Sequence, residues 1–352
     1  MNNIKGELKK ADEDYGKYGL TKNKTYDWED GQRLNPDNFQ AGEYEWWYTD
    51  GHLANGYFFV AAFHFEFNAK GEPECFITFN LANEEGVVLD LILPVNFDNI
   101  TAKKEYCDVN FNGHYIHSLD GLNKFEVFID ASQIEGNYGL HLEFEKQVPT
   151  FKPGSAHWDA DGKYFAWLCT APSASITGTM TINGQQETVQ GSGYHDHNWG
   201  NCPMSDILGD WLWSRAEVDG ITVVTSSVRF NEQCGGKETK FAYLAKGDNI
   251  LINAIEDDVI CLEGIKIPQP DTGKKTSSDC IYIVEGEEGS NYIRFQGQKA
   301  VASFPFGENK NWRTWYTRFV SKTILDLNIN GEVIKATAPS TLEVMDFFGE
   351  KK

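Results

Sequence analysis

Acidic and aromatic residues alternate near the start of the chain, in the run EYEWWY at residues 43–48. Successive side chains of a strand point to opposite faces, so Glu45 and Trp47 are expected to share one face. Trp46 and Tyr48 are expected on the other face. A carboxyl group beside indole rings on an inward face is desolvated, which raises its pKa. Glu45 is therefore a candidate proton donor at neutral pH.

A second motif, YHDHNWG at residues 194–200, holds two histidines around an aspartate. His195 and His197 are expected on one face of a strand, and Asp196 on the other. One imidazole could act as acid or base while a carboxylate orients it. Two histidines at this spacing are also half of a zinc site, although the sequence shows no obvious third ligand. The third interpretation is structural, a hydrogen-bonded strand end that joins one barrel to another.

A third motif, DWLWSRAEVDG, adds two more tryptophans, Trp211 and Trp213. Together the motifs could supply the aromatic wall of a binding pocket. The structural alternative is that the rings pack a core, in which Glu45 pairs with Arg215 or Arg318.

Charge and missing motifs exclude several classes of function. The chain has 52 acidic and 31 basic residues and a net charge of −21. Such a surface repels phosphate backbones and anionic membranes, so we expect neither a nucleic-acid partner nor membrane insertion. The GSG at residues 191–193 lacks the spacing and the βα context of a dinucleotide loop, and there is no GxSxG elbow. We therefore expect no cofactor and no metal.

The N-terminal stretch and the cysteines indicate the compartment. The stretch is polar and has no apolar run typical of a secretory signal. No segment approaches the roughly 20 apolar residues that span a bilayer. The seven cysteines form an odd set with no CxxC pair, which fits reduced thiols. We expect a cytoplasmic protein of undetermined oligomeric state.

Short apolar runs separated by turn residues recur from Glu43 onward. The run GYFFVAAFHFEF at residues 56–67 alternates with period two, which is typical of a strand. Regularly spaced strands without helical stretches predict an all-β fold of sandwiches or barrels. Three dipeptides between alternating runs predict tight hairpin turns: Asn183-Gly184, Asp219-Gly220 and Asn330-Gly331.

The length of 352 residues suits two domains better than one. Residues 1–40 are charged and poor in apolar positions, which predicts an N-terminal arm, irregular or laid over the body as a strand. The regular spacing of strand-like runs is interrupted near residues 201–208, which contain Pro, Ser and Asp. We therefore predict an N-terminal domain at 41–204 and a C-terminal domain at 205–352.

The three motifs occur in a fixed order, EWWY, then GYHDHNWG, then DWLWSRAEVDG. In this combination the chain resembles the carotenoid hydratase (hydroxyneurosporene synthase) superfamily of lipocalin-like proteins, which includes kievitone hydratase and fungal Diels–Alderases. The resemblance covers roughly residues 40–345. It implies two lipocalin-like antiparallel β-barrel or sandwich domains packed together, with a ligand pocket at or near their interface.

The resemblance also implies that His197 and Trp199 line the pocket. In the carotenoid hydratases, a Tyr and an Asp on the strand after the Asp-Gly hairpin complete the acid site. Residues 221–228 contain neither, which argues against carotenoid hydration itself. Thr225 and Ser227 remain there as groups that could hydrogen-bond a ligand.

The leading hypothesis is a cofactor-independent hydratase, isomerase or cyclase acting on an unsaturated, largely apolar or phenolic small molecule. An acid in an apolar pocket would protonate an alkene, and indole faces would stabilise the cation. The alternative is a non-catalytic carrier, because lipocalin-like barrels often hold ligands unchanged. A metal-dependent enzyme built on His195 and His197 is a third possibility. The candidate catalytic residues are His197, Asp196, Glu45 and Trp199. The candidate substrate-binding residues are Trp47, Tyr48, Tyr194, His195, Trp211, Trp213, Thr225 and Ser227.

Overall fold

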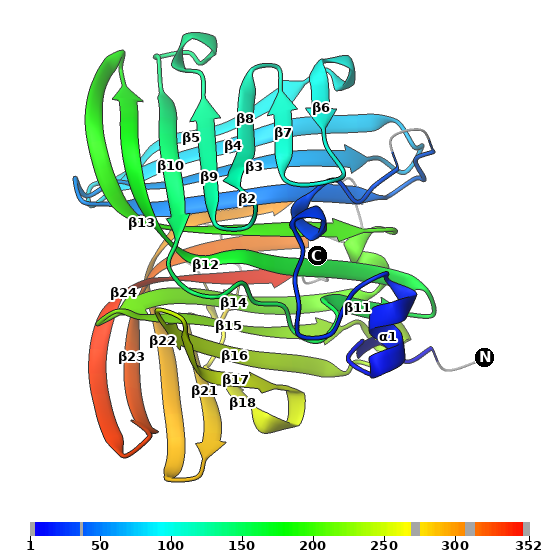
Figure 1. Cartoon of the computed structure of the whole chain (residues 1–352), viewed down its shortest axis with the longest axis vertical. Coiled ribbons are helices and arrows are strands. Elements are labelled where there is room, and N and C mark those ends of the chain that lie inside the picture. Colours follow the sequence, from blue (N-terminus) through cyan, green and yellow to red (C-terminus); the bar gives the residue numbers. More distant parts are fainter. Residues whose placement is uncertain (1–3, 36–37, 269–274, 307–313, 348–352) are drawn as a thin grey trace. The chain divides into compact units, whose positions relative to one another are not determined.

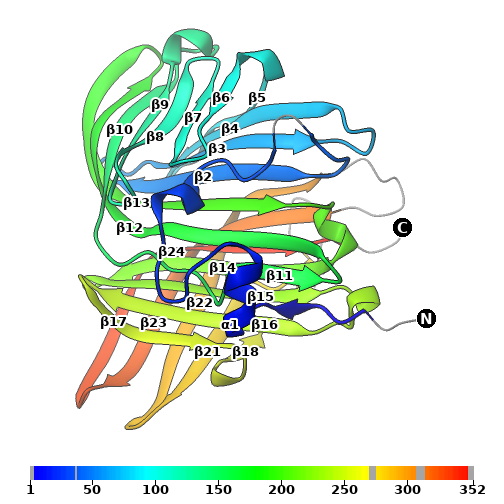
Figure 2. The ribbon, with the colours of Figure 1, turned by 45° about the vertical axis from the view of Figure 1, so that its right-hand side comes forward.

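The computed structural model describes residues 4–35, 38–268, 275–306 and 314–347 (Figures 1 and 2). The chain forms two compact units. The N-terminal unit comprises Lys9–Trp158 and Lys163–Pro203, and the C-terminal unit comprises Met1–Leu8, Asp159–Gly162 and Met204–Lys352. The all-β prediction is confirmed, since each unit is built on one large antiparallel sheet.

The N-terminal unit is a nearly closed barrel with the strand order β5-β4-β3-β2-β13-β12-β10-β9-β8-β7-β6. Its strands are β2 (Tyr44–Leu53), β3 (Phe58–Phe67), β4 (Pro73–Asn83), β5 (Gly86–Val95), β6 (Ile100–Ala102), β7 (Asp108–Phe111), β8 (His114–Asp120), β9 (Lys124–Ile129), β10 (Gly139–Lys146), β12 (Lys163–Ile182) and β13 (Gln185–Gly200). Its helical turns are α1 (Asp12–Lys17) and the 3₁₀ turns η1 (Asp27–Asp30), η2 (Phe97–Asn99) and η3 (Ala131–Gln133). Two short strands lie off this path and are not confined to the N-terminal unit: β1 (Glu7–Leu8) pairs with β11 (His157–Ala160), which also pairs with β12.

The C-terminal unit is a half-barrel with the strand order β17-β16-β15-β14-β24-β23-β22-β21-β18. Its strands are β14 (Leu208–Val218), β15 (Ile221–Phe230), β16 (Glu238–Lys246), β17 (Asn249–Ile255), β18 (Ile260–Glu263), β21 (Asp279–Gly286), β22 (Gly289–Phe306), β23 (Thr314–Ile329) and β24 (Glu332–Asp346). A small hairpin joins β19 (Ile267–Pro268) and β20 (Lys275–Thr276). The 3₁₀ turns are η4 (Met204–Asp206), η5 (Glu232–Cys234) and η6 (Glu256–Asp258).

Phenylalanines fill the N-terminal barrel. Phe63, Phe65 and Phe67 of β3 alternate into the core, as the period-two pattern predicts, and each is at most 4% exposed. Burying a ring of this size contributes about 1.5–3 kcal/mol to the free energy of folding. These contacts therefore stabilise the barrel whose wall carries the EYEWWY and YHDHNWG motifs.

All three predicted hairpin dipeptides form their turns. Asn183 and Gly184, which connect β12 to β13, have φ values of 50° and 76°. A type I′ turn requires positive φ at both central residues, and Asn-Gly tolerates it best. The dipeptides at 219–220 and 330–331 have positive φ at both positions as well.

Two facing glycines make room for the core. Gly51 of β2 and Gly193 of β13 are partners across the ladder. A Cβ at Gly193 would lie 2.5 Å from the Phe144 ring and 2.6 Å from the end of Ile176, so the glycine lets both side chains fill the centre of the barrel.

Gly193→Ala is expected to destabilise the protein by about 1–3 kcal/mol, because the added methyl group forces a close-packed core apart. Urea unfolding measures the loss. Gly16→Ala in α1 is the control, since no atom lies within 4 Å of its added Cβ. This helical control should stabilise by about 0.5–1 kcal/mol. Equal effects of the two substitutions would contradict the packing argument.

All seven cysteines lie in the described residues, and no disulfide joins any of them. Six of them are buried. Among the described residues no helix has the length and apolar character to cross a membrane.

Candidate functional site

Strands β2 and β13 bring the first two motifs together in the wall of the N-terminal barrel. Across their ladder His197 faces Trp47, and Trp199 faces Glu45. The ring of Trp47 stacks on His197 with centroids 4.7 Å apart, and Trp47 belongs to the barrel core. These four side chains therefore lie on the inner face, in the alternation expected for two strands.

His197 is fully buried and bonded through both ring nitrogens. Its Nδ1 lies 3.1 Å from the carbonyl oxygen of Glu29, and its Nε2 lies 2.8 Å from Oε1 of Glu45. Glu45 also accepts hydrogen bonds from the backbone N–H groups of Arg33 and Leu34, at 2.6 and 3.0 Å. These contacts satisfy a carboxylate that would otherwise be costly to bury.

Within the N-terminal unit, the partners of the Glu45 carboxylate are the histidine and the two backbone N–H groups. The alternative in which Glu45 pairs with Arg215 or Arg318 joins residues of two separately described units, so it stays a prediction. Arg318 donates through Nε to Glu343 at 2.8 Å.

His195 faces a second buried carboxylate. Its Nδ1 lies 2.9 Å from the carbonyl oxygen of Tyr48, so Nδ1 carries a hydrogen, and its Nε2 lies 3.0 Å from Oδ2 of Asp30. The hydroxyl of Thr170 donates to Oδ1 of Asp30 at 3.0 Å. Burial lowers the pKa of His195, but the Asp30 carboxylate and the Tyr48 carbonyl outweigh burial and raise it overall. The Asp30 carboxylate thus favours the imidazolium form of His195.

One segment of the N-terminal arm, residues 27–34, supplies hydrogen-bond partners to the His197–Glu45 pair and to His195. Glu29 and Asp30 are at most 3% exposed. The indole N–H of Trp47 donates to the carbonyl of Asp30 at 2.9 Å, and Lys152 pairs with Glu29. Figures 1 and 2 show this dark-blue turn beside β13. Glu29 and Asp30 of the arm are therefore buried against β13, in a segment for which the sequence predicted an irregular arm or a strand laid over the body.

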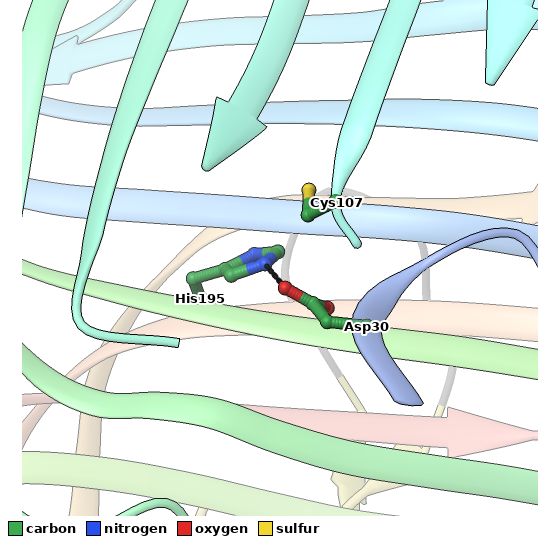
Figure 3. A group of neighbouring side chains, drawn as sticks. All are labelled: Asp30, Cys107 and His195. Carbon is green, nitrogen blue, oxygen red and sulfur yellow. Dashed lines mark hydrogen bonds and ion pairs between the residues drawn. The ribbon is translucent and has the colours of Figure 1, made fainter. Parts of the chain in front are cut away.

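Cys107 lies next to the second pair (Figure 3). Ligand atoms of Asp30, Cys107 and His195 all lie within 4.8 Å of one another, and all three residue types can bind zinc. They do not form a nucleophile triad, because Asp30 faces Nε2 and the Tyr48 carbonyl occupies Nδ1. Burial raises the pKa of the Cys107 thiol well above its usual range. The neutral thiol form of Cys107 is therefore favoured, beside the contact between His195 and Asp30.

The opposite face of β13 carries a third carboxyl group, Asp196. Its Oδ2 accepts hydrogen bonds from the Tyr194 hydroxyl at 2.7 Å and the Trp167 indole N–H at 2.8 Å. Its Oδ1 accepts one from the Asn198 amide at 2.7 Å. Tyr194 and Asn198 flank it on the same strand, and Trp167 reaches over from β12, where it faces Asn198. Three neutral donors hold this carboxyl group.

The environment of Asp196 suits proton transfer near neutral pH. The residue is 6% exposed. Burial raises its pKa to about 7, against the hydrogen bonds from Trp167 and Tyr194, which lower it. A carboxyl group with this pKa can donate a proton and regain one from solvent at similar cost. One hydrogen bond to Oδ1 also leaves a position at that oxygen for the exchangeable proton.

Tyr194→Phe removes one of the two donors to Oδ2. Since hydrogen bonds to a carboxylate lower its pKa, we expect the pKa of Asp196 to rise above its value of about 7. The carbonyl stretch of the protonated acid, followed against pH by infrared difference spectroscopy, measures this change. Tyr138→Phe, which removes a hydroxyl bonded to Asn183 at 2.7 Å, is the control and should leave the midpoint in place. An unchanged titration midpoint of Asp196 in Tyr194→Phe would show that the Tyr194 hydroxyl does not hydrogen-bond to this carboxyl group.

Four of the predicted substrate-binding residues lie in the C-terminal unit. Trp211 and Ser227 line a small cavity of about 20 Å³, which has room for about one water molecule. The Ser227 hydroxyl donates to Glu238 at 2.6 Å. Trp213 and Thr225 are buried. The other eight predicted residues lie in the N-terminal unit. The structure describes each unit by itself, so the predicted pocket between the domains stays a prediction.

Sequence similarity to curated proteins is local, and no family model matches the chain. The chain is 26% identical over 126 residues to the quinolone epoxide rearrangement protein asqO of Emericella nidulans, which is 35% of this chain and 33% of that protein. It is 34% identical over 55 residues to a hydroxyneurosporene dehydrogenase of Chlorobaculum tepidum, 14% of each protein. The matches thus span a third or less of these relatives.

Similarity of fold extends over most of the chain. The structure of CghA with Sch210972 matches with a TM-score of 0.68 and 16% identity, over 90% of this chain and 94% of that one. Kievitone hydratase from Nectria haematococca matches with a TM-score of 0.55 and 11% identity, over 90% and 96%. The resemblance to the carotenoid hydratase-like superfamily is confirmed. The lipocalin-like fold expected for this superfamily is confirmed with it.

The similar proteins differ in the reactions that their names describe, a rearrangement in one case and a hydration in another. Similarity to them therefore leaves the reaction of this chain to be argued from its own residues.

Proposed function

We propose that this chain is a cofactor-independent enzyme of the hydratase, isomerase or cyclase kind, which acts by acid–base catalysis on an unsaturated, largely apolar or phenolic small molecule. The observation that carries the proposal is the Asp196 carboxyl group, buried, held by Tyr194, Trp167 and Asn198, and with a pKa raised to about 7. The names of similar proteins support it, because opening an epoxide and hydrating an alkene both begin with proton transfer to the substrate.

In the proposed mechanism, the protonated Asp196 gives its proton to an alkene carbon or an epoxide oxygen. In the alkene, the π bond supplies the electron pair of the new C–H bond, and a carbocation forms. In the epoxide, an oxygen lone pair takes the proton, and the C–O bond then breaks with its electrons going to oxygen, which also leaves a carbocation. Water then adds and loses a proton, or the cation loses a proton from a neighbouring carbon, and the carboxylate takes up that proton. The hydrogen bonds from Tyr194 and Trp167 strengthen as the carboxylate forms, so they stabilise the transition state more than the ground state.

In this proposal His197 and Glu45 are positioning residues. Both are fully buried, and each is bonded to residues of the arm. Their hydrogen bonds hold the inner face of β13 in place. Because successive side chains of a strand point to opposite faces, these bonds also set the direction of Asp196 on the outer face.

Solvent isotope incorporation tests the proposal without advance knowledge of the substrate. The protein is incubated in D2O with a panel of alkenes, phenols and epoxides, and the products are analysed by mass spectrometry. Alkene protonation places deuterium on carbon, and an epoxide rearrangement appears as a new isomer. Asp196→Asn should lower both signals by a factor of about 10²–10⁴. Turnover that persists in Asp196→Asn at the wild-type rate would assign the acid to another residue.

A second candidate function is that of a non-catalytic carrier. It is favoured by the inner-face residues His195, His197 and Glu45, whose polar atoms bond to the protein itself. The same panel separates the candidates. A carrier shows saturable binding, seen as a change in tryptophan fluorescence, with neither deuterium incorporation nor isomerisation.

A further inference from the structure

The wall of the C-terminal half-barrel has a gap between its two edge strands. The strand order begins at β17 and ends at β18, and only the turn η6 connects them. β18 has four residues and pairs with Cys280–Ile283 of β21. In the described part of the sheet, residues 284–286 of β21 therefore have no strand on that side, and β17 lies on the other side of the gap.

A hollow of about 540 Å³ lies at this gap, a volume typical of small-molecule sites. It is lined by β17, by the end of the β21–β22 hairpin and by the turn between β23 and β24. Ile252, Ala254 and Val284 contribute to its lining and belong to the barrel core, where each is at most 8% exposed. A ligand here would contact the apolar core of the half-barrel directly.

The rim of the hollow is acidic. Among the described residues that line it, none is lysine or arginine and five carry carboxylates: Asp257, Asp258, Glu285, Glu287 and Glu288. Two of the five are hydrogen-bonded, Glu285 to the Ser290 hydroxyl at 2.8 Å and Glu288 to the Gly331 N–H at 2.5 Å. All five residues are exposed, so their carboxylates are solvated and lie beside the apolar residues that line the floor of the hollow. This arrangement attracts cations and repels anions.

We propose that this hollow is a binding site for a small organic cation with an apolar body, such as an aryl- or alkylammonium compound. The ammonium group lies among the carboxylates of η6 and the β21–β22 turn, and the apolar body covers Ile252, Ala254 and Val284. The site is independent of the Asp196 chemistry proposed above, because every residue that carries it belongs to the C-terminal unit.

Two probes of equal size and opposite charge test the site. Binding of 4-phenylbutylamine and 4-phenylbutyrate to the full chain is measured by titration calorimetry at low and high salt. We expect the amine to bind at least tenfold more tightly than the carboxylate, with the difference shrinking at high salt. Equal affinities for the two probes would overturn the proposal.

Two variants locate the binding. The triple variant Asp257→Asn, Asp258→Asn, Glu287→Gln should weaken amine binding about tenfold. A control triple variant, Glu84→Gln, Glu85→Gln, Glu105→Gln, changes the net charge equally at exposed positions outside the hollow and should leave binding unchanged. Equal weakening in both would show attraction to the whole acidic protein and overturn the site.

Ala254→Trp fills the floor of the hollow and should abolish binding of the amine. Circular dichroism and thermal unfolding establish that the variant is folded, and if it is not, the two triple variants decide. Unchanged affinity in folded Ala254→Trp would overturn the proposal, since the ring occupies the space that the apolar body needs.

Discussion

Asp196→Asn is expected to lower turnover by a factor of about 10²–10⁴, the usual contribution of a general acid. The acid form of Asp196 is the active one, so the wild-type rate should fall as pH rises through about 7. The residual rate of the variant should lack this dependence. Pre-steady-state rates between pH 5 and 9 measure both effects. Asp90→Asn, at an exposed position, is the control and should retain the wild-type profile.

The same substitution is expected to stabilise the protein at pH 8. The pKa of Asp196 is about 7 in the folded state and near 3.8 unfolded. This raised pKa favours folding below pH 3.8, and the advantage is lost as pH rises through about 7. Removing the charge should therefore recover up to about 4 kcal/mol at pH 8, from roughly three units at 1.36 kcal/mol each.

The two results together identify the role of Asp196. A substitution that removes activity while it raises stability cannot act by unfolding the protein. If Asp196→Asn lost activity and stability together at pH 8, the carboxyl group would have a structural role, and the proposed mechanism would need another acid.

Asp30→Asn is expected to destabilise the protein by about 3–5 kcal/mol at pH 6, because it leaves the buried His195 imidazolium without its counter-charge. The raised pKa of His195 adds a pH dependence. Its contribution to stability is complete below the unfolded value of 6.5 and is lost as pH rises through the raised value. The difference between Asp30→Asn and wild type should therefore be smaller at pH 9 than at pH 6.

Asp27→Asn is the matched control for this prediction. Asp27 lies in the same 3₁₀ turn but is exposed, so its substitution should change stability by less than about 0.5 kcal/mol. Urea unfolding at both pH values measures all three proteins. Equal losses for the two substitutions, or a loss that does not depend on pH, would contradict the buried ion pair.

Local patterns in the sequence predicted the parts of this structure that depend on neighbouring residues. The hairpin at Asn183-Gly184 follows from the turn chemistry of that dipeptide. The separation of His195 and His197 from Asp196 follows from the two-residue period of a strand. These two features decide which faces the chemical groups occupy.

The partners of these groups could not be predicted in the same way. Asp30 meets His195 across 165 residues, and Trp167 reaches Asp196 because of the register between β12 and β13. Register and long-range pairing are set by the packing of the whole barrel, which no local pattern encodes. The acidic run at residues 27–30 and the isolated tryptophan in the 163–169 stretch were the only available signals.

The position of the β12–β13 hairpin in the sheet also constrains how the chain folds during synthesis. The hairpin is the last part of the N-terminal barrel to be translated, yet it lies between β2 and β10 in the strand order. At 5–20 residues per second, a ribosome needs on the order of ten seconds or more to pass from Asp30 to His195. Until then β2–β5 and β6–β10 remain two separate sheets with open edges, which are prone to mispairing. The nascent barrel must therefore close in one late step, when Glu29 and Asp30 of the arm contact His197 and His195.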